Sequence, residues 1–194
     1  MKKITITQIS EKKIKAGNPL LQMEDFPNEL SFDEGELVEL VDSRQKFVAK
    51  AYLAKQNKGV GWVFSLDNAD SFNEAFFKKQ FEKAKRKRTD LQSDPETTTY
   101  RLFNAEGDGI PGVTIDHYDG FAVVSWYSEG IFRYQTAIIA AFQAVFPETK
   151  GIYEKFRYQR KDGLISRYVR GDAAPTPLIV KENGINYATY LDDG

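Results

Sequence analysis

The chain has 194 residues, 41% of them hydrophobic, and its 27 basic and 28 acidic side chains give a formal net charge of −1. This length fits one large or two small domains, and the apolar content excludes wholesale disorder. The absence of cysteine excludes disulfides, thiolate metal sites and a cysteine nucleophile, and the single histidine disfavours a histidine-rich metal site or a Ser-His-Asp triad. No apolar run is long enough to span a membrane, so we expect a cytoplasmic protein without a membrane partner.

Local charge bias is strong, and local patches set the field that a partner meets. Residues 24–42 carry eight acidic side chains and no lysine or arginine. Residues 78–88 carry seven basic side chains and one acid, and residues 150–170 carry seven basic side chains and two acids. The basic segments are therefore candidates for contact with a polyanion.

The first third of the chain predicts short strands. Ile4 and Ile6 alternate with threonine, which is typical of a half-buried strand over 3–9. A short helix over 11–16 ends at Gly17. Three further strands are expected: Leu37–Val41, Phe47–Leu53 and Gly59–Phe64. Polar turns separate these strands, and one of the turns lies at 56–59. This spacing predicts a small β-rich domain or barrel.

The next segment predicts a helix. Ser71 and Glu74 form a capping-box pattern, which favours a helix from Phe72 to about Leu91. Its last turns are basic, which suits the negative end of the helix dipole. The polar residues 92–98, with Pro95, read as a linker.

The second half of the chain predicts strands, then a helix, then strands, and hence an α+β fold. A helix is expected over 131–146, with Pro147 behind it. Asn183-Gly184 is a strong hairpin signal between the last two strands. The strands expected here are 100–104, 113–118, 121–126, 151–155, 178–182 and 185–190.

The run Gly107–Gly112 has the letters of a dinucleotide-binding loop, but that loop requires a helix to follow it. Here the residues after Gly112 read as a strand, and Pro111 removes an amide donor. We therefore interpret the run as a connection between strands. His117, beside Asp116 and Asp119, is interpreted as a solvated surface residue rather than a ligand or a base.

Two basic segments have competing interpretations. The segment 78–88 is either the solvated face of an amphipathic helix or a stripe that contacts phosphates. In the segment 153–170, aromatic side chains alternate with arginine and lysine, which suits either phosphate contact with base stacking or a hairpin with buried aromatics and exposed arginines. A third basic cluster precedes Gly17. The acidic segment 24–42 would oppose nucleic acid if it lay on the same face.

The segment Tyr100–Gly130 resembles a known family through its Asp108–Gly112 turn followed by a Thr-Ile-Asp strand. This pattern is similar to the central domain of the PUA-domain-containing class I SAM-dependent RNA methyltransferases, whose best known members methylate carbon 5 of a cytosine in large-subunit ribosomal RNA. His117 stands where the family has a basic residue. Glu182–Gly184 resembles the start of the family's hairpin, and Lys13–Pro19 is similar to its N-terminal basic loop.

The resemblance implies a PUA-like β-barrel over 1–70, a connecting basic helix and linker over 71–98, and a small ββ-α-ββ domain over 99–194. It implies that the SAM-binding loop and the catalytic cysteine lie beyond this chain. We therefore expect no catalytic residue, no metal and no cofactor here, with S-adenosylmethionine expected for a full-length parent. RNA, in particular ribosomal RNA, is the expected partner.

The candidate nucleic-acid-binding residues lie in the three basic segments. They are Lys13, Lys15, Lys85, Arg86, Lys87, Arg88, Arg157, Arg160, Lys161, Arg167 and Arg170. One hypothesis is that they bind RNA and position it for a catalytic domain. The other is a scaffold or homodimerisation module without RNA affinity of its own, in which the basic helix is solvated and the tyrosine-rich strands form an interface.

Overall fold

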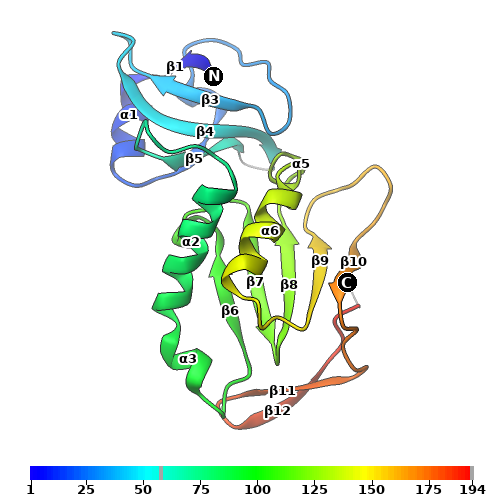
Figure 1. Ribbon diagram of the computed structural model, residues 1–194. Coiled ribbons are helices and arrows are strands. Elements are labelled where there is room, and N and C mark those ends of the chain that lie inside the picture. Colours follow the sequence, from blue (N-terminus) through cyan, green and yellow to red (C-terminus); the bar gives the residue numbers. More distant parts are fainter. Residues whose placement is uncertain (57–58, 193–194) are drawn as a thin grey trace.

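The computed structural model describes residues 1–56 and 59–192. Its N-terminal part is a five-stranded sheet of order β1-β3-β4-β5-β2, drawn in blue to cyan at the top of Figure 1. β1 is parallel to β3, and the other pairs are antiparallel. The strands are β1 (Lys2–Thr5), β2 (Leu20–Leu21), β3 (Leu37–Val41), β4 (Phe47–Gln56) and β5 (Gly59–Ser65).

The expected closed barrel is wrong for the residues that the structure describes. β1 and β2 are the two edges of the sheet and do not pair with each other. β2 has only two residues, too few to form a ladder that closes the sheet. Helix α1 (Gln8–Lys15) and a 3₁₀ turn, η1 (Met23–Asp25), lie between β1 and β3 in the chain, and Ile14 and Phe26 from this region join the apolar cluster of the sheet.

The small helix begins earlier than the sequence predicts, because Thr7 accepts a hydrogen bond from the amide of Ser10 and caps it. The turn expected at 56–59 includes residues 57 and 58, which lie outside the described residues, as do 193 and 194.

The second part is another five-stranded sheet, of order β10-β9-β8-β7-β6. Only β8 and β9 are parallel, because the helical segment crosses between them. Three strands of this sheet precede the helical segment that crosses from β8 to β9, and two follow it. The expected ββ-α-ββ arrangement is therefore not confirmed, whereas the expected fold class α+β is confirmed. The strands are β6 (Thr99–Asn104), β7 (Val113–Tyr118), β8 (Phe121–Trp126), β9 (Gly151–Phe156) and β10 (Ser166–Gly171).

Two long helices cover one face of this sheet (Figure 1). Phe81 of the first contacts Phe103 of the sheet and Phe142 of the second, with ring centroids 4.8 and 5.7 Å apart. The helical segments are α2 (Glu74–Lys87), α3 (Thr89–Ser93), α4 (Ala105–Asp108), α5 (Glu129–Phe132) and α6 (Gln135–Val145).

Both predicted long helices are interrupted. The expected helix over 72–91 is α2 followed by α3, and its cap is Asn73, whose side chain accepts from the amide of Phe76 at 3.1 Å. The predicted Ser71 capping box is therefore wrong. The expected helix over 131–146 is α5 followed by α6, and α5 is capped by the buried Ser128.

The last element is a hairpin of β11 (Leu178–Glu182) and β12 (Ile185–Thr189), seen at the bottom of Figure 1. Asn183 and Gly184 both have positive φ, as the predicted tight turn requires. Leu178 and Val180 pack against Phe121, Val123 and Tyr153, on the sheet face that α2 and α6 leave open.

The two parts share one apolar core, which joins β4 and β5 to the helices. The hydroxyl of Tyr52 on β4 donates to the carbonyl oxygen of Pro111 at 2.9 Å. The hydroxyl of Tyr134 donates to the carbonyl oxygen of Gly35 at 2.6 Å. Tyr52 and Phe72 stack at 5.5 Å between centroids. The cluster thus includes residues on both sides of position 70, and the predicted domain boundary there stays a prediction.

The glycine-rich run 107–112 belongs to this junction. It forms the end of α4 and the turn into β7, so the predicted strand does follow it. Gly112 has φ of +81°, and a Cβ there would lie 2.5 Å from the Tyr52 hydroxyl. Gly112 therefore takes part in the packing of the two parts. Among the described residues, no helix has the length and apolarity to cross a membrane.

We predict that Gly112→Ala destabilises the protein more than Gly163→Ala. Both positions have positive φ, which costs a non-glycine residue about 1–2 kcal/mol, but a Cβ at Gly163 would meet nothing within 4 Å. The contact with Tyr52 should add about 1–3 kcal/mol of overpacking at Gly112. Urea unfolding of the two variants measures the difference, and equal losses would contradict the packing role of Gly112.

Candidate nucleic-acid interface

The lysines of α1 are engaged within the N-terminal part. Lys13 donates to Asp25 at 2.9 Å, and Asp25 also accepts from Ser10 and from the amide of Gln22. Lys15 pairs with Glu11 one turn earlier at 2.6 Å and keeps 61% of its side chain exposed. Lys13 therefore helps to fix η1 against α1, whereas Lys15 has only a surface ion pair. Contact of either lysine with RNA stays a prediction.

The end of α2 is tied to the central sheet by its basic side chains. Arg88 donates to Asp108 at 2.6 Å and to the carbonyl oxygen of Arg101 at 2.7 Å, and only 14% of its side chain is exposed. Lys87 also pairs with Asp108, at 3.0 Å. Lys85 donates to the carbonyl oxygen of Val145 at 2.8 Å and so satisfies the end of α6.

Arg86 differs from its neighbours on α2. Its side chain is exposed. Of the four candidate residues 85–88, three are thus used to hold α2, α4 and α6 together, and Arg86 points to the outside. The amphipathic-helix interpretation accounts for most of this cluster, and its contact with RNA stays a prediction.

Asp108 is the acceptor on which the end of α2 depends. Burial alone would raise the pKa of Asp108, but hydrogen bonds from Arg88, the amide of Asn104 and Lys87 outweigh it and hold the pKa below its usual value. The carboxylate therefore stabilises the folded state only while it is ionised.

The segment between β9 and β10 contains two arginines that pack on aromatic rings. Arg160 lies 4.3 Å from the centroid of Phe156 and pairs with Asp162 at 2.6 Å. Arg167 donates to Glu154 at 2.7 Å, and Glu154 is fully buried, with its other oxygen accepting from Gln135 at 2.9 Å. These arginines stabilise the segment that carries them.

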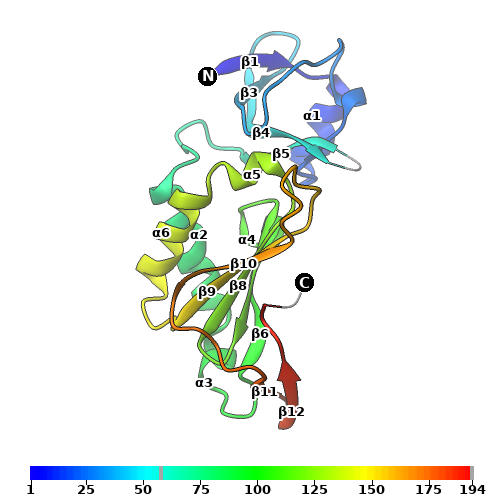
Figure 2. The ribbon, with the colours of Figure 1, turned by 90° about the vertical axis from the view of Figure 1, so that its right-hand side faces the viewer.

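Three further candidates of this segment are exposed: Arg157, Lys161 and Arg170. Arg170 donates to Gln143 of α6 at 2.6 Å. The amide of Arg157 donates to the carbonyl oxygen of Trp126 at 2.7 Å. β10 is the edge strand of the central sheet opposite β6, and α2 lies beside β6 (Figure 1), so the two predicted basic patches lie toward opposite edges of the sheet. Arg170 of β10 nevertheless contacts α6, on the helix-covered face that Figure 2 shows from the side.

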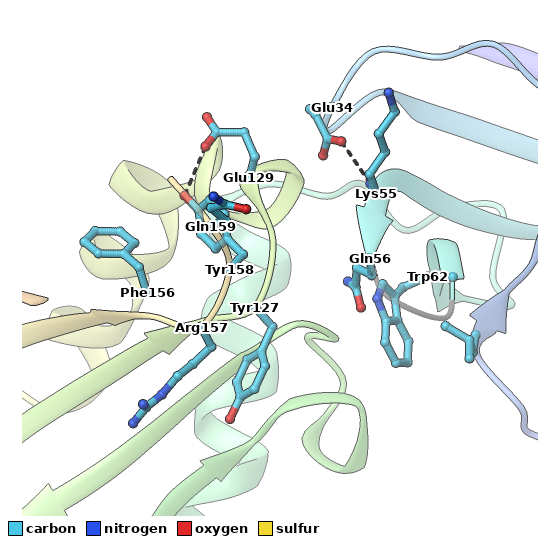
Figure 3. A pocket seen from close by; sticks show the side chains of 12 residues that line it. Glu34, Lys55, Gln56, Trp62, Tyr127, Glu129, Phe156, Arg157, Tyr158 and Gln159 are labelled. Atoms are coloured by element: carbon cyan, nitrogen blue, oxygen red, sulfur yellow. Dashed lines mark hydrogen bonds between the residues drawn. The ribbon is translucent and has the colours of Figure 1, made fainter. Parts of the chain in front are cut away.

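Arg157 lies at the rim of a cleft of about 1010 Å³ between the N-terminal sheet and the central part, which we call the interdomain cleft (Figure 3). The first wall comes from β2, β4, β5 and the loop before β3, and the second from the ends of β8 and β9. The lining residues are Leu20, Glu34, Lys55, Gln56, Gly59, Trp62, Tyr127, Glu129, Phe156, Arg157, Tyr158 and Gln159.

The second wall is held rigidly. The hydroxyl of Tyr158 donates to Glu129 at 3.0 Å and accepts from Arg160 at 3.3 Å. Burial, together with the neighbouring carboxylate, raises the pKa of Tyr158 to about 12, so the phenol stays protonated at neutral pH. The negative charge of Glu129 is thus partly engaged by a donor.

The first wall holds three buried polar atoms without a hydrogen-bond partner among the described residues: Oε2 of Glu34, Nε2 of Gln56 and Nε1 of Trp62. The other oxygen of Glu34 accepts from the amide of Lys55 at 2.9 Å. An unsatisfied buried polar group costs about 1–3 kcal/mol. Three of them beside one cleft mark this wall as unusual for a purely structural surface.

Trp62 and Tyr127, two of the aromatic residues that line the cleft, cannot be singled out from the sequence. Trp62 lies in the middle of β5 and Tyr127 directly follows β8. Only the packing of two sheets brings them to one cleft. The structure also corrects His117, which is half-buried, stacks on Tyr100 at 4.9 Å between centroids and accepts from the Gly120 amide. Burial lowers the pKa of His117.

Among the described residues, no cluster of histidine, aspartate and glutamate could hold a metal ion.

The chain is similar to known proteins in its N-terminal domain and along its whole length. Residues 4–66 match the family model of the PUA-like domain. Over its whole length the chain is 38% identical to the "Putative ribosomal RNA large subunit methyltransferase YwbD" of Bacillus subtilis, covering 50% of that protein. It is also 30% identical over 82% of its length to the "Ribosomal RNA large subunit methyltransferase I" of Cronobacter sakazakii, covering 41% of that protein.

A solved structure shows the same architecture. "A putative sam-dependent methyltransferase from Streptococcus mutans" superposes on the entire chain with a TM-score of 0.92 and 41% identity, and the chain covers 50% of it. The chain thus has a PUA-like domain and is homologous to large-subunit ribosomal RNA methyltransferases. It spans about half the length of these relatives.

We predict that Asp108→Asn lowers stability at neutral pH by about 2 kcal/mol, the range for hydrogen bonds to a charged group. The wild-type free energy of unfolding should fall as the pH drops from the ordinary aspartate pKa of about 4 through the lower folded value, because the unfolded state then binds the proton more tightly. The variant should lose part of this dependence. Urea unfolding between pH 2 and 7 measures it.

Asp90→Asn is the matched control, because Asp90 is exposed on α3. It should leave the acid dependence as in the wild type. An acid-side slope in Asp108→Asn equal to that of the wild type would refute the role of Asp108.

We predict that Arg167→Ala lowers the free energy of unfolding by about 2 kcal/mol. Breaking a fully buried ion pair costs about 3–5 kcal/mol. The loss is smaller here because 40% of the Arg167 side chain is exposed. The loss arises because the buried carboxyl group of Glu154 is left without its cationic partner. Adding Glu154→Gln to Arg167→Ala should therefore recover more than half of it. Thermal and urea unfolding give the values, with Arg170→Ala as an exposed control, and a double variant no more stable than Arg167→Ala would exclude this explanation.

Proposed function

We propose that the chain is the N-terminal, RNA-recognising part of a SAM-dependent methyltransferase that acts on large-subunit ribosomal RNA. The observation that carries the proposal is the homology to such enzymes along the whole chain, together with the PUA-like domain over 4–66. The bacterial relatives have ribosomal RNA in their names, and bacterial ribosomes are assembled in the cytoplasm, which is where the proposal places this protein.

The proposal assigns positioning of RNA, and not chemistry, to these 194 residues. We propose carbon 5 of a cytosine as the target. Methylation of that carbon requires a thiolate that adds to carbon 6, and the sequence contains no cysteine. S-adenosylmethionine would belong to the half of the relatives that this chain does not cover. The chain alone would then be catalytically inactive.

The exposed cations of the β9–β10 segment are the best candidates for phosphate contact in this proposal. Arg157 and Lys161 are exposed, whereas Arg160 pairs with Asp162 at the surface and Arg167 pairs with the buried Glu154. Arg157 also lies in the interdomain cleft, beside aromatic side chains. Arginine beside aromatic rings is typical of surfaces that bind unpaired RNA.

The alternative is a scaffold or homodimerisation module. It is favoured by exposed apolar side chains on the β11–β12 hairpin, where Ile179, Ile185 and Tyr187 are 54%, 59% and 45% exposed. A tight dimer in sedimentation equilibrium, with no RNA binding at low salt, would support this alternative and contradict the RNA-recognising role.

We predict that the chain binds large-subunit ribosomal RNA with an affinity that falls steeply with salt, and that Arg157→Ala/Lys161→Ala weakens it across RNA sequences. Each lost phosphate contact should reduce the slope of log K against log salt by about 1. Filter binding from 50 to 300 mM KCl measures affinity and slope.

The matched control is Arg44→Ala/Lys46→Ala, which removes the same charge from the exposed turn between β3 and β4. It should bind like the wild type. RNA affinity that does not depend on salt would count against the proposed function, and equal losses in both double variants would show that net charge, not the β9–β10 segment, is responsible.

A further inference from the structure

The interdomain cleft brings together aromatic rings from three elements. Trp62 lies on β5, Tyr127 follows β8, and Tyr158 follows β9. Figure 3 shows Trp62 on one wall, with Tyr127 and Tyr158 on the other. The side chain of Tyr127 is 40% exposed, so its ring is accessible from the cleft.

Two hydrogen bonds at the junction fix the spacing of these walls. Trp62 is the antiparallel partner of Tyr52, whose hydroxyl binds the carbonyl oxygen of Pro111. The amide of Tyr127 donates to the carbonyl oxygen of Gly112, the next residue, at 3.0 Å. Both rings are therefore positioned by the same junction, and the cleft is preformed, which lowers the entropic cost of binding.

The polar groups of the cleft suit the edge and the backbone of a nucleotide. Gln56 and Trp62 carry donors and Glu34 an acceptor; their atoms Nε2, Nε1 and Oε2 are buried beside the cleft without a hydrogen-bond partner among the described residues, so a base edge would reach them after a side-chain rotation. Base edges carry acceptors and donors side by side, so such a mixed set can serve them. Arg157 supplies an exposed cation on the opposite wall, while the carboxylate there, on Glu129, is engaged by Tyr158.

The volume of the interdomain cleft also favours a ligand of the size of a nucleotide. About 1010 Å³ lies at the upper end of the range for small-molecule clefts. A duplex presents stacked bases whose faces are unavailable to side chains, whereas unpaired bases can leave the stack and lie on aromatic rings.

We propose that the interdomain cleft binds an unpaired stretch of RNA, with bases stacked on Trp62 and Tyr127 and a phosphate at Arg157. The inference rests on the proposed function, which requires RNA binding but names no place for unpaired bases. It makes the cleft, rather than the α1 lysines or the end of α2, the part of the chain that distinguishes single-stranded from double-stranded RNA.

The experiment compares three fluorescein-labelled probes by anisotropy at 100 mM KCl: a randomised hexaribonucleotide pool, an abasic hexamer with the same phosphates, and a twelve-base-pair RNA duplex. The wild-type chain should bind the pool at least 5-fold more tightly than the abasic hexamer or the duplex. Tyr127→Ala should weaken binding of the pool by about 5- to 100-fold, the effect of losing one stacked base, and should leave the abasic hexamer unchanged.

A second readout uses tryptophan fluorescence with unlabelled RNA. The sequence has two tryptophans, and Trp126 is fully buried, so quenching by the pool should report on Trp62. Trp62→Phe should abolish the quenching. Tyr187→Ala is the matched control, because Tyr187 is a similarly exposed tyrosine on β12, and it should bind the pool like the wild type.

The outcomes separate the inference from the proposed function. Equal affinity for the pool and the abasic hexamer, with Tyr127→Ala unchanged, overturns the cleft as a base-binding site while salt-sensitive RNA binding stands. Binding of no RNA at low salt overturns both. Should Trp62→Phe fold poorly, the selective loss in Tyr127→Ala decides the question alone.

Discussion

The hydroxyl of Tyr52 donates to the carbonyl oxygen of Pro111 across the boundary between the two sheets, from a position without solvent exposure. The contact requires a residue without a Cβ at Gly112, whose φ is also positive. On the other side of the junction, Gly130 of α5 packs against β4, where a Cβ would lie 2.5 Å from that of Ala54. These close approaches let two sheets share one core, and every other interdomain feature follows from them.

The junction determines the geometry of the candidate site as well. Trp62 pairs with Tyr52 in the ladder, and Tyr127 is bonded to Gly112 through its amide. A rotation of one sheet against the other would therefore separate the two walls of the cleft. Gly112 of the Asp-Gly-Ile-Pro-Gly run, which carries the resemblance to the methyltransferase family, takes part in this packing, and Asp108 of the same run pairs with Arg88.

Basic residues of this chain fall into two physical groups. Lys13, Arg88 and Arg167 each meet a buried carboxylate, on Asp25, Asp108 and Glu154. Removing such a cation leaves a charge in a poorly solvated place, which is costly. Arg86, Arg157 and Lys161 are exposed instead, so a partner can use their charge without unfolding local structure.

The sequence by itself determined the local elements of this protein. Short apolar runs located most of the strands, although not β2 or β10, and Asn183-Gly184 located the last hairpin. The absence of a helix after Gly112 disfavoured a dinucleotide loop. These features depend on neighbours in the chain. The tertiary structure decided which basic residues are free, that the N-terminal sheet stays open, and that Trp62 and Tyr127 share a cleft. These depend on contacts between residues that lie far apart in sequence, and periodicity carries no information about such contacts.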